Sequence, residues 1–280
     1  MKACVLAVIP ARAGSKGLPG KCVASLCGRP LIEYTIDHAV AAGCLGGICV
    51  TTDSAIAAGV AEQRGVFVVH RPAELATDQA PVDAAVRHAV ESFEHANDGF
   101  HSDVVVILYA SIPIRAPGLV DRAVTHLIQT GADSVRSVAP VGKHHPDWLH
   151  RLDGDRMQQF RPNHIHRRQD LDPLYYHDGA VIAVTRAALY SPPRAPDDHH
   201  AFFGQDRRAI IQSPDDAIDV DTELDLIVAE ALLNRDGHGP EQAKYPALGT
   251  TTLEGSLRAD ATRPGVAARR QVHRKWALSE

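Results

Sequence analysis

No part of this sequence is long and apolar enough to cross a lipid bilayer as a helix. The apolar run Ala3–Ile9 is far shorter than the ~20 residues that a membrane-spanning helix needs. It runs into a glycine-bearing loop and lacks the small-residue cleavage site of a secretory signal. We therefore expect this run to be a first β-strand, and the protein to be cytoplasmic and not bound to a membrane.

Cysteine and paired metal ligands are scarce. The five cysteines form no C-x-x-C pair, and Cys4 and Cys49 lie inside apolar runs, so we expect small core residues in a reducing compartment. Histidine occurs sixteen times, but nowhere with H-E-x-x-H spacing or a nearby cysteine partner. A structural zinc site is therefore not expected.

Positive charge is not in excess. The chain has 29 Lys and Arg against 34 Asp and Glu, a formal net charge of −5. No global positive field would draw it to nucleic acid or to an anionic membrane, and we expect neither as a partner. A mildly acidic protein that binds an anionic substrate must therefore keep its positive charge local, in a site.

Short apolar runs alternate with amphipathic stretches along most of the chain. This alternation predicts a three-layer α/β fold with a mostly parallel sheet, and ligands of such sheets bind beyond the carboxyl ends of the strands. The expected strands are Ala3–Ile9, Gly47–Thr52, Val66–Val69, Asp103–Tyr109, Ser134–Ala139, Gly179–Val184 and Ala209–Gln212, and the expected helices are Pro30–Val40, Ser54–Arg64, Val82–Glu94, Pro117–Gln129 and a strongly amphipathic Thr222–Leu233.

The alternation stops at about Gly142. Residues 142–178 are rich in His, Arg, Asp and Pro with poor periodicity, which indicates an excursion from the sheet, either a lid or an arm that packs on another subunit. Beyond Asn234 the pattern fades again. We therefore expect one domain over residues 1–234, with the excursion inside it, and a C-terminal tail over residues 235–280 to which no fold is assigned.

A loop rich in glycine and cations follows the first strand. It carries Arg12, Lys16 and Lys21 within ten positions, and its glycines and Ser15 allow backbone amides to face outward. It is neither a Walker A loop nor a dinucleotide-binding G-x-G-x-x-G loop, which excludes those two classes. At the end of a strand, such a loop suits a triphosphate, since amides cradle the oxygens and cations neutralise the charge. The alternative is a solvated basic turn.

Two acidic residues alternate with apolar ones near position 220. If Ile218 to Val220 follow a strand period, Asp219 and Asp221 point to one face. Adjacent carboxylates repel one another unless a cation lies between them, and hard oxygen ligands of this kind suit Mg²⁺. The alternative is a helix N-terminus capped by Asp221 or Thr222. The two interpretations are compatible.

Polar residues also stand at the ends of the other expected strands. Asp53 closes the second strand, Arg71 follows the third, and Ser111 and Arg115 follow the fourth. In a parallel sheet these points meet at one edge, so the residues are candidates for one site. The alternative for each is an ordinary turn or cap residue.

Together these stretches resemble the acylneuraminate cytidylyltransferases, the CMP-sialic acid synthetase family. The matching stretches span about residues 1–233 in the family's order and are IPARAGSKGLPGK, CGRPLIEYTIDHA, TTDS, RPAELATD, SIPIR, HHP, RRQDL, the FF pair and DAIDVDTELDLIVAE. The related KDO enzymes share the opening loop but typically carry arginine where this chain has Lys16-Gly17, which favours the sialic-acid side.

The resemblance implies a Rossmann-like fold of the nucleotide-diphospho-sugar transferase type, with a small excursion that mediates dimerisation, and a homodimer. It implies transfer of CMP from CTP to the anomeric hydroxyl of an acidic nine-carbon sugar, with release of pyrophosphate and Mg²⁺ as cofactor. The residues that it carries over are Arg12, Lys21 and Asp221 for catalysis; Arg12, Ala13, Gly14, Ser15, Lys16, Lys21, Arg71 and Asp78 for the nucleotide; Tyr109, Ser111, Arg168, Asp178, Phe202 and Phe203 for the sugar; and Asp219 and Asp221 for the metal.

The sequence departs from the family pattern in the opening loop and at the sugar side. Cys22 replaces the usual asparagine, and Tyr109-Ala110-Ser111 stands where the family usually has Gln-Pro-Thr. Both this stretch and Tyr176-His177-Asp178-Gly179 are similar to the pseudaminic-acid branch. The sugar therefore stays open among sialic, pseudaminic and legionaminic types. A nucleotidyltransferase for KDO or another sugar and a non-catalytic nucleotide-binding module are the alternatives.

Overall fold

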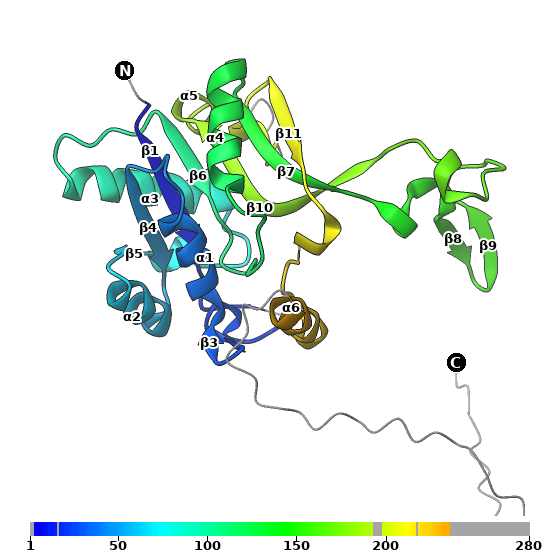
Figure 1. Ribbon diagram of the computed structural model, residues 1–280, viewed down its shortest axis with the longest axis horizontal. Helices are drawn as coiled ribbons and strands as arrows, with labels where there is room; N and C mark the ends of the chain where they lie inside the picture. Colours follow the sequence, from blue (N-terminus) through cyan, green and yellow to red (C-terminus); the bar gives the residue numbers. More distant parts are fainter. Residues whose placement is uncertain (1–2, 16, 193–197, 217, 236–280) are drawn as a thin grey trace, which may run out of the picture. The chain divides into compact units, whose positions relative to one another are not determined.

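The computed structural model describes residues 3–15, 17–192, 198–216 and 218–235. A seven-stranded sheet forms the core of the fold (Figure 1). The strand order is β11-β7-β10-β6-β1-β4-β5. Only β10 runs antiparallel to its neighbours among these strands, so the sheet is mostly parallel, as predicted. The strands are β1 (Val5–Pro10), β4 (Gly47–Thr52), β5 (Phe67–His70), β6 (Val104–Ile107), β7 (Ser134–Pro140), β10 (Tyr175–Thr185) and β11 (Arg207–Ile211).

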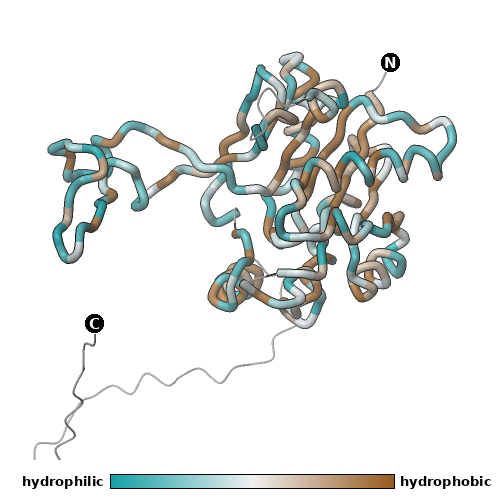
Figure 2. The backbone as a smooth tube through the Cα atoms, turned by 180° about the vertical axis from the view of Figure 1, so that it is seen from behind, coloured by the Kyte–Doolittle hydropathy of each residue, from teal (hydrophilic) through white to brown (hydrophobic). Residues whose placement is uncertain are grey.

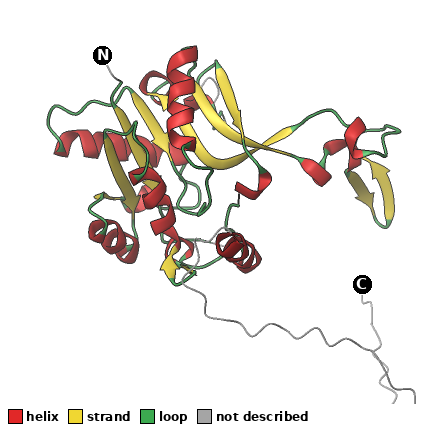
Figure 3. Cartoon of the chain, viewed as in Figure 1, coloured by secondary structure: helices red, strands yellow, loops and turns green. Residues whose placement is uncertain are grey.

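Helices cover both faces of the sheet, which confirms the three-layer prediction (Figure 3). Helices α1, α2 and α4 pack on one face, and α3 and α5 pack on the other. The helices are α1 (Leu31–Val40), α2 (Ala55–Gln63), α3 (Val82–Ala96), α4 (Leu119–Thr130), α5 (Arg186–Leu189) and α6 (Glu223–Arg235). A two-residue pair, β2 (Ser25–Leu26) with β3 (Arg29–Pro30), precedes α1.

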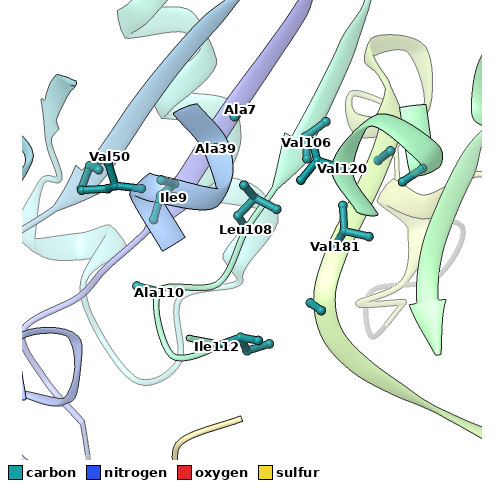
Figure 4. Packing of buried hydrophobic residues seen from close by; sticks show 14 of the residues in the cluster. Ala7, Ile9, Ala39, Val50, Val106, Leu108, Ala110, Ile112, Val120 and Val181 are labelled. Carbon is teal, nitrogen blue, oxygen red and sulfur yellow. The ribbon is translucent and has the colours of Figure 1, made fainter. Parts of the chain in front are cut away.

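The first strand is apolar at every position because both of its sides are covered. Ala7 and Ile9 belong to the core cluster under α1 and α4, and Leu6 and Val8 belong to the cluster under α3. Figure 4 shows the first of these clusters, where Ala7 and Ile9 of β1 lie near Val106 of β6. A strand buried on both faces gives a continuous apolar run instead of an alternating one, which is why the sequence revealed it.

The excursion leaves the sheet between β7 and β10, as expected from the sequence. Its only strands among the described residues are the hairpin β8 (His150–Asp153) and β9 (Arg156–Gln159). Figure 2 shows this segment as mostly hydrophilic, whereas the central strands are hydrophobic. β10 begins at Tyr175, before the expected Gly179, because Tyr175 and Tyr176 pair with the end of β7 before a bulge interrupts the ladder.

Two local expectations for the region after residue 217 are wrong. Residues 218–221 form no sheet strand, although Val220 is fully buried and donates one backbone hydrogen bond to the carbonyl of Ser111 at 3.0 Å. Helix α6 is not strongly amphipathic either, since Leu224 and Ile227 are 67% and 58% exposed. Ala229 and Leu233 form its buried contact.

The tail prediction falls almost entirely on residues 236–280, which lie outside the described residues. Within the described part of the chain, no helix has both the length and the apolar character needed to cross a membrane.

Gly204 provides a test of the packing between β7 and the segment that carries Phe203. Its φ is +70° with ψ −155°, a region that is essentially restricted to glycine, and a Cβ there would lie 2.3 Å from the Cβ of Asp133. Asp133 cannot move freely, because its carboxylate accepts from the backbone N–H groups of Gln205 and Asp206 at 2.6 and 3.0 Å. We expect Gly204→Ala to lower the free energy of unfolding by about 2 kcal/mol or more.

Urea unfolding followed by circular dichroism measures this effect. Gly59→Ala is the matched control, because Gly59 lies inside α2 and an added Cβ would meet nothing within 4 Å. That variant should gain up to ~1 kcal/mol from helix propensity. Equal stability of Gly204→Ala and the parent would contradict the packing argument.

Candidate functional site

A cavity of about 280 Å³ opens where β1, β5 and β6 end. The carboxyl ends of these parallel strands lie at one edge because β1 pairs in register with both β4 and β6. The cavity is lined by Pro10, Arg12, Gly14, Ser15, Lys21, Cys22, Arg71, Leu75, Thr77, Asp78, Ala80, Pro81, Val82, Ala85, Tyr109, Ala110 and Ser111. Of the four strand-end candidates, Arg71 and Ser111 line this cavity, whereas Asp53 and Arg115 do not.

The opening loop is fixed to β4 by hydrogen bonds. The N–H of Ala11 donates to the carbonyl of Thr51 at 3.0 Å, and the hydroxyl of Thr52 donates to the carbonyl of Ala11. The N–H of Ala13 donates to a carboxylate oxygen of Asp53 at 2.7 Å. The amide of Ala13 is therefore already bonded within the protein, while Gly14 and Ser15 line the cavity. The predicted nucleotide residue Lys16 lies outside the described residues.

The cations of the loop are paired with acids from distant parts of the chain. Nζ of Lys21 donates to Asp221 at 2.7 Å, and Arg12 donates to Asp78 at 2.6 Å. Lys21 is the more buried partner of its pair, with its side chain 18% exposed against 68% for Asp221. The loop and the predicted metal residues are thus brought together across two hundred residues of sequence.

Arg71 completes the positive side of the cavity. It donates to the carbonyl of Thr51 at 2.9 Å, which holds its guanidinium beside the loop. Burial, together with the nearby Arg12, lowers the pKa of Arg71, and Asp53 opposes that shift. A guanidinium that is poorly compensated and partly desolvated is well suited to a phosphate.

Asp219 and Asp221 lie on either side of buried Val220 and are both exposed, so the predicted alternation holds without a strand. Partial burial raises the pKa of Asp219, with Asp221 adding to the rise, while hydrogen bonding from Ser111 and the charge of Lys21 oppose it. Two neighbouring carboxylates repel one another, and a divalent cation bound between them would relieve that repulsion. No group of three or more His, Cys, Asp or Glu that could hold a metal is found in the described residues. Mg²⁺ here would therefore need oxygens from water and substrate as further ligands.

The helix-capping alternative also holds, and Thr222 is the capping residue. The hydroxyl of Thr222 accepts from the N–H of Asp225 at 3.4 Å, and the Asp225 carboxylate accepts from the N–H of Thr222 at 2.8 Å. This reciprocal pair caps α6. It leaves the side chains of Asp219 and Asp221 available for another role.

The predicted sugar residues divide into two groups. Tyr109 and Ser111 line the cavity. The other four do not line it within one chain. Arg168 lies exposed in the excursion, Asp178 is buried with both oxygens bonded to Ser137, Ala180 and Gln212, and Phe202 and Phe203 are buried in the core.

Arg115, a strand-end candidate, is also absent from the cavity lining. It is buried and donates to the carbonyls of Tyr109, Ile112 and Ala180 at 2.9, 2.5 and 2.6 Å. Its role is therefore to fix the turn after β6 that carries Tyr109. No local pattern signals this role, because an arginine after a strand looks the same in a sequence whether it points inward or outward.

Gly17 is a site residue that sequence reasoning missed. A Cβ at this position would lie 2.5 Å from the backbone carbonyl oxygen of Asp221. Glycine is therefore required for the opening loop to reach the acidic segment. The only signal in the sequence was the glycine density of the loop.

Comparisons with known proteins identify the family of this chain. A sequence model described as cytidylyltransferase matches residues 6–234. The N-acylneuraminate cytidylyltransferase of Streptococcus agalactiae serotype V is 33% identical over 226 residues, which cover 79% of this chain and 51% of that protein, so this chain matches only about half of its length. The CMP-N,N'-diacetyllegionaminic acid synthase of Legionella pneumophila is 33% identical over 235 residues, covering 82% of this chain and 96% of that protein. The pseudaminic acid cytidylyltransferase of Campylobacter jejuni is 28% identical over 231 residues, covering 81% and 95%.

A solved structure has the same fold. The CMP:2-keto-3-deoxy-manno-octonic acid synthetase complexed with CTP superposes with a TM-score of 0.63 at 18% identity, covering 84% of this chain and all of that one. The family model matches most of the described residues, and two relatives are one-third identical to this chain. The chain therefore belongs to the cytidylyltransferase family.

Proposed function

We propose that this protein transfers CMP from CTP to the anomeric hydroxyl of an acidic nine-carbon sugar and releases pyrophosphate. The observation that carries the proposal is the 2.7 Å contact between Lys21 and Asp221, which joins a phosphate-type loop to an acidic pair at the edge of the sheet. Relatives named as synthases or cytidylyltransferases for three such sugars support it.

The reaction joins two anions, so neutralisation and positioning are the main tasks of the protein. The hydroxyl oxygen of the sugar forms a bond to the α-phosphorus of CTP, the bond from that phosphorus to the bridging oxygen of the β-phosphate breaks, and the hydroxyl proton passes to solvent. Arg12, Lys21 and Arg71 line the cavity, which supports a role for them in binding phosphate oxygens and in stabilising the charge on the departing pyrophosphate.

Asp219 and Asp221 would hold the Mg²⁺ ion, whose charge would help to neutralise phosphate oxygens when it is bound. Before substrate binds, Lys21 is the counterion of Asp221, and Arg12 is the counterion of Asp78. Arrival of the triphosphate gives both cations a stronger partner, which frees Asp221 for the metal. The ion pairs thus offset the charges of the site and hold its cations in place.

We take the sugar to be an acid of the legionaminic or pseudaminic type. The relatives with those names match this chain over 96% and 95% of their own lengths. Tyr109, in place of the usual glutamine, gives the sugar side of the cavity an aromatic wall that rests against Gly179.

Free thiols at all five cysteines suit a cytoplasmic enzyme.

The excursion supplies a candidate dimer contact. Its hairpin and flanking residues expose large apolar side chains, with Leu152 at 71% and Met157 at 66%. Exposed apolar side chains that gather on a small element indicate a protein interface. We propose that two copies associate through this excursion and that Arg168 thereby reaches the cavity of the partner.

Removing either member of the Lys21–Asp221 pair should abolish most turnover while leaving the fold intact. We expect Lys21→Ala and Asp221→Ala to lower kcat/KM by at least 10²–10³, which is ~3–4 kcal/mol of transition-state stabilisation. Pyrophosphate release measures the rate. Asp206→Ala is the matched control, since Asp206 forms an equally short pair with Arg208 at 2.8 Å on the exposed strand β11. Near-normal turnover in either site variant would defeat the assignment.

A substrate panel tests the reaction itself. Pyrophosphate release should require CTP, Mg²⁺ and one of N,N'-diacetyllegionaminic, pseudaminic or N-acetylneuraminic acid, and an excess of EDTA should stop it. Each other nucleoside triphosphate and KDO serve as comparisons. Turnover confined to KDO, or to a nucleotide other than CTP, would replace the proposed substrate, and no turnover with any combination would favour a binding module.

The dimer proposal has its own test. We expect the double substitution Leu152→Glu and Met157→Glu to convert a dimer to a monomer in sedimentation velocity, because the charges would have to be buried in the interface. Leu224→Glu on α6 is the control, with a side chain that is similarly exposed at 67%. A parent protein that sediments as a monomer would refute this arrangement. So would a control variant that loses the dimer while the double variant keeps it.

A further inference from the structure

Asp53 directly follows β4 and is absent from the cavity lining, yet its carboxylate is bonded to the opening loop. One carboxylate oxygen accepts from the backbone N–H of Ala13 at 2.7 Å, forty residues away in the sequence. Both Asp53 and Ala13 are exposed residues, so breaking this bond leaves no buried polar group without a partner. We therefore expect the bond to matter little for global stability and to act on the loop that it holds.

The sheet stops supporting the loop at the point where Asp53 begins to do so. β1 pairs with β4 in parallel register as far as Pro10 and Thr51, and the N–H of Ala11 extends the ladder by one more bond to the carbonyl of Thr51. No further hydrogen bond between backbone groups joins the loop to β4 among the described residues. Beyond Ala11, the side chain of Asp53 therefore provides the tie between the loop and the end of β4.

The bond from Ala13 fixes one peptide unit of the loop. A peptide unit is planar and includes the Cα atoms of both of its residues, so holding the N–H of Ala13 also sets the position from which the Arg12 side chain leaves the loop. The same unit is held on its other side, where the thiol of Cys22 donates to the carbonyl of Arg12 at 3.5 Å. Arg12 and Cys22 both line the cavity, so this peptide unit lies at its wall.

The residues after Ala13 are the ones that need a fixed orientation. Gly14 and Ser15 line the cavity, and within the described part of the chain their N–H groups donate to no protein acceptor. Amides in this state are available to an anion. Their direction depends on the peptide unit before them, which Asp53 holds.

Asp53 also lies beside the cation of the third strand end. Asp53 and Arg71 both line a hollow that adjoins the cavity. Burial lowers the pKa of Arg71, and the charge of Asp53 is the main effect that opposes this shift. One carboxylate therefore bonds to the loop and offsets part of the cost of desolvating Arg71.

We propose that Asp53 is a positioning residue for the triphosphate: by accepting from Ala13 it presents the amides of Gly14 and Ser15 and the guanidinium of Arg12 to the phosphates. This inference rests on the proposed function, in which the opening loop binds CTP. Asp53 itself does not touch the nucleotide. A carboxylate in contact with a phosphate would repel it, and the place of Asp53 outside the cavity lining fits a supporting role.

The test compares two ligands that differ only in their phosphates. Isothermal titration calorimetry in the presence of Mg²⁺ gives the Kd of CTP, and displacement by CTP gives the Kd of cytidine. For Asp53→Ala, the Kd of CTP should rise about 10-fold, the effect of losing one charge-assisted hydrogen bond, whereas the Kd of cytidine should stay within about twofold. A general loss of structure would weaken the binding of both ligands.

Asp103→Ala is the matched control. Asp103 is also an exposed carboxylate, and it accepts from the backbone N–H of Cys4 at 2.8 Å, next to the opposite end of β1. This variant loses the same kind of bond far from the loop and should bind CTP as the parent does.

Two conservative variants separate the hydrogen bond from the charge. Asp53→Asn keeps an acceptor oxygen at the same distance along the side chain and removes the charge, so it should restore most of the affinity for CTP. Asp53→Glu keeps the charge but displaces the carboxylate by one methylene group, so its Kd for CTP should exceed that of Asp53→Asn.

An Asp53→Ala protein that binds CTP as tightly as the parent, or that loses affinity for CTP and cytidine by the same factor, would overturn the proposal. If Asp53→Ala does not fold, the conservative variants decide: equal affinities of Asp53→Asn and Asp53→Glu for CTP, or tighter binding by Asp53→Glu, would overturn it. A parent protein that does not bind CTP would instead overturn the proposed function itself.

Discussion

The approach of the acidic segment to the opening loop is the contact on which the rest of the site depends. Apolar packing produces it: Leu18 of the loop and Val220 of the acidic segment belong to one hydrophobic cluster with Leu31 of α1. Gly17 permits the close passage of the two backbones. Burial of Val220 fixes the position of the segment. The carboxylates of Asp219 and Asp221 are therefore held at the surface despite their mutual repulsion, and they remain able to bind a cation.

Charge at the site is arranged in pairs of opposite sign. The net charge of −5 gives no general attraction for an anion. At the cavity, Lys21 and Arg12 are each neutralised by a carboxylate, so the fold does not bear two unpaired cations. An anionic ligand exchanges these partners instead of entering an uncompensated positive field.

The antiparallel strand β10 contributes to the site through its bulge. Arg115 ties this bulge to the turn after β6 by donating to Ala180 on one side and to Tyr109 and Ile112 on the other. Burial lowers the pKa of Arg115 to about 9, so its many hydrogen bonds are needed to offset the loss of hydration. The same turn carries Ser111, whose carbonyl holds Val220. One buried guanidinium therefore supports both the turn that carries Tyr109 and the acidic segment around Val220.

The sequence by itself determined the layered fold, the excursion and the phosphate-type loop, because each is written in consecutive residues: apolar runs for buried strands, amphipathic periods for helices, and cations among glycines. The tertiary structure alone decided which side chains reach the cavity. Asp178 and Phe203 looked like site residues but are turned into the core. Their roles depend on pairing between strands far apart in the chain. The 218–221 segment shows the same limit, since its alternating pattern predicted a strand, yet the burial of Val220 and its backbone hydrogen bond to Ser111 fix its place outside the sheet. Periodicity records which side of a segment is buried, and not which partner buries it.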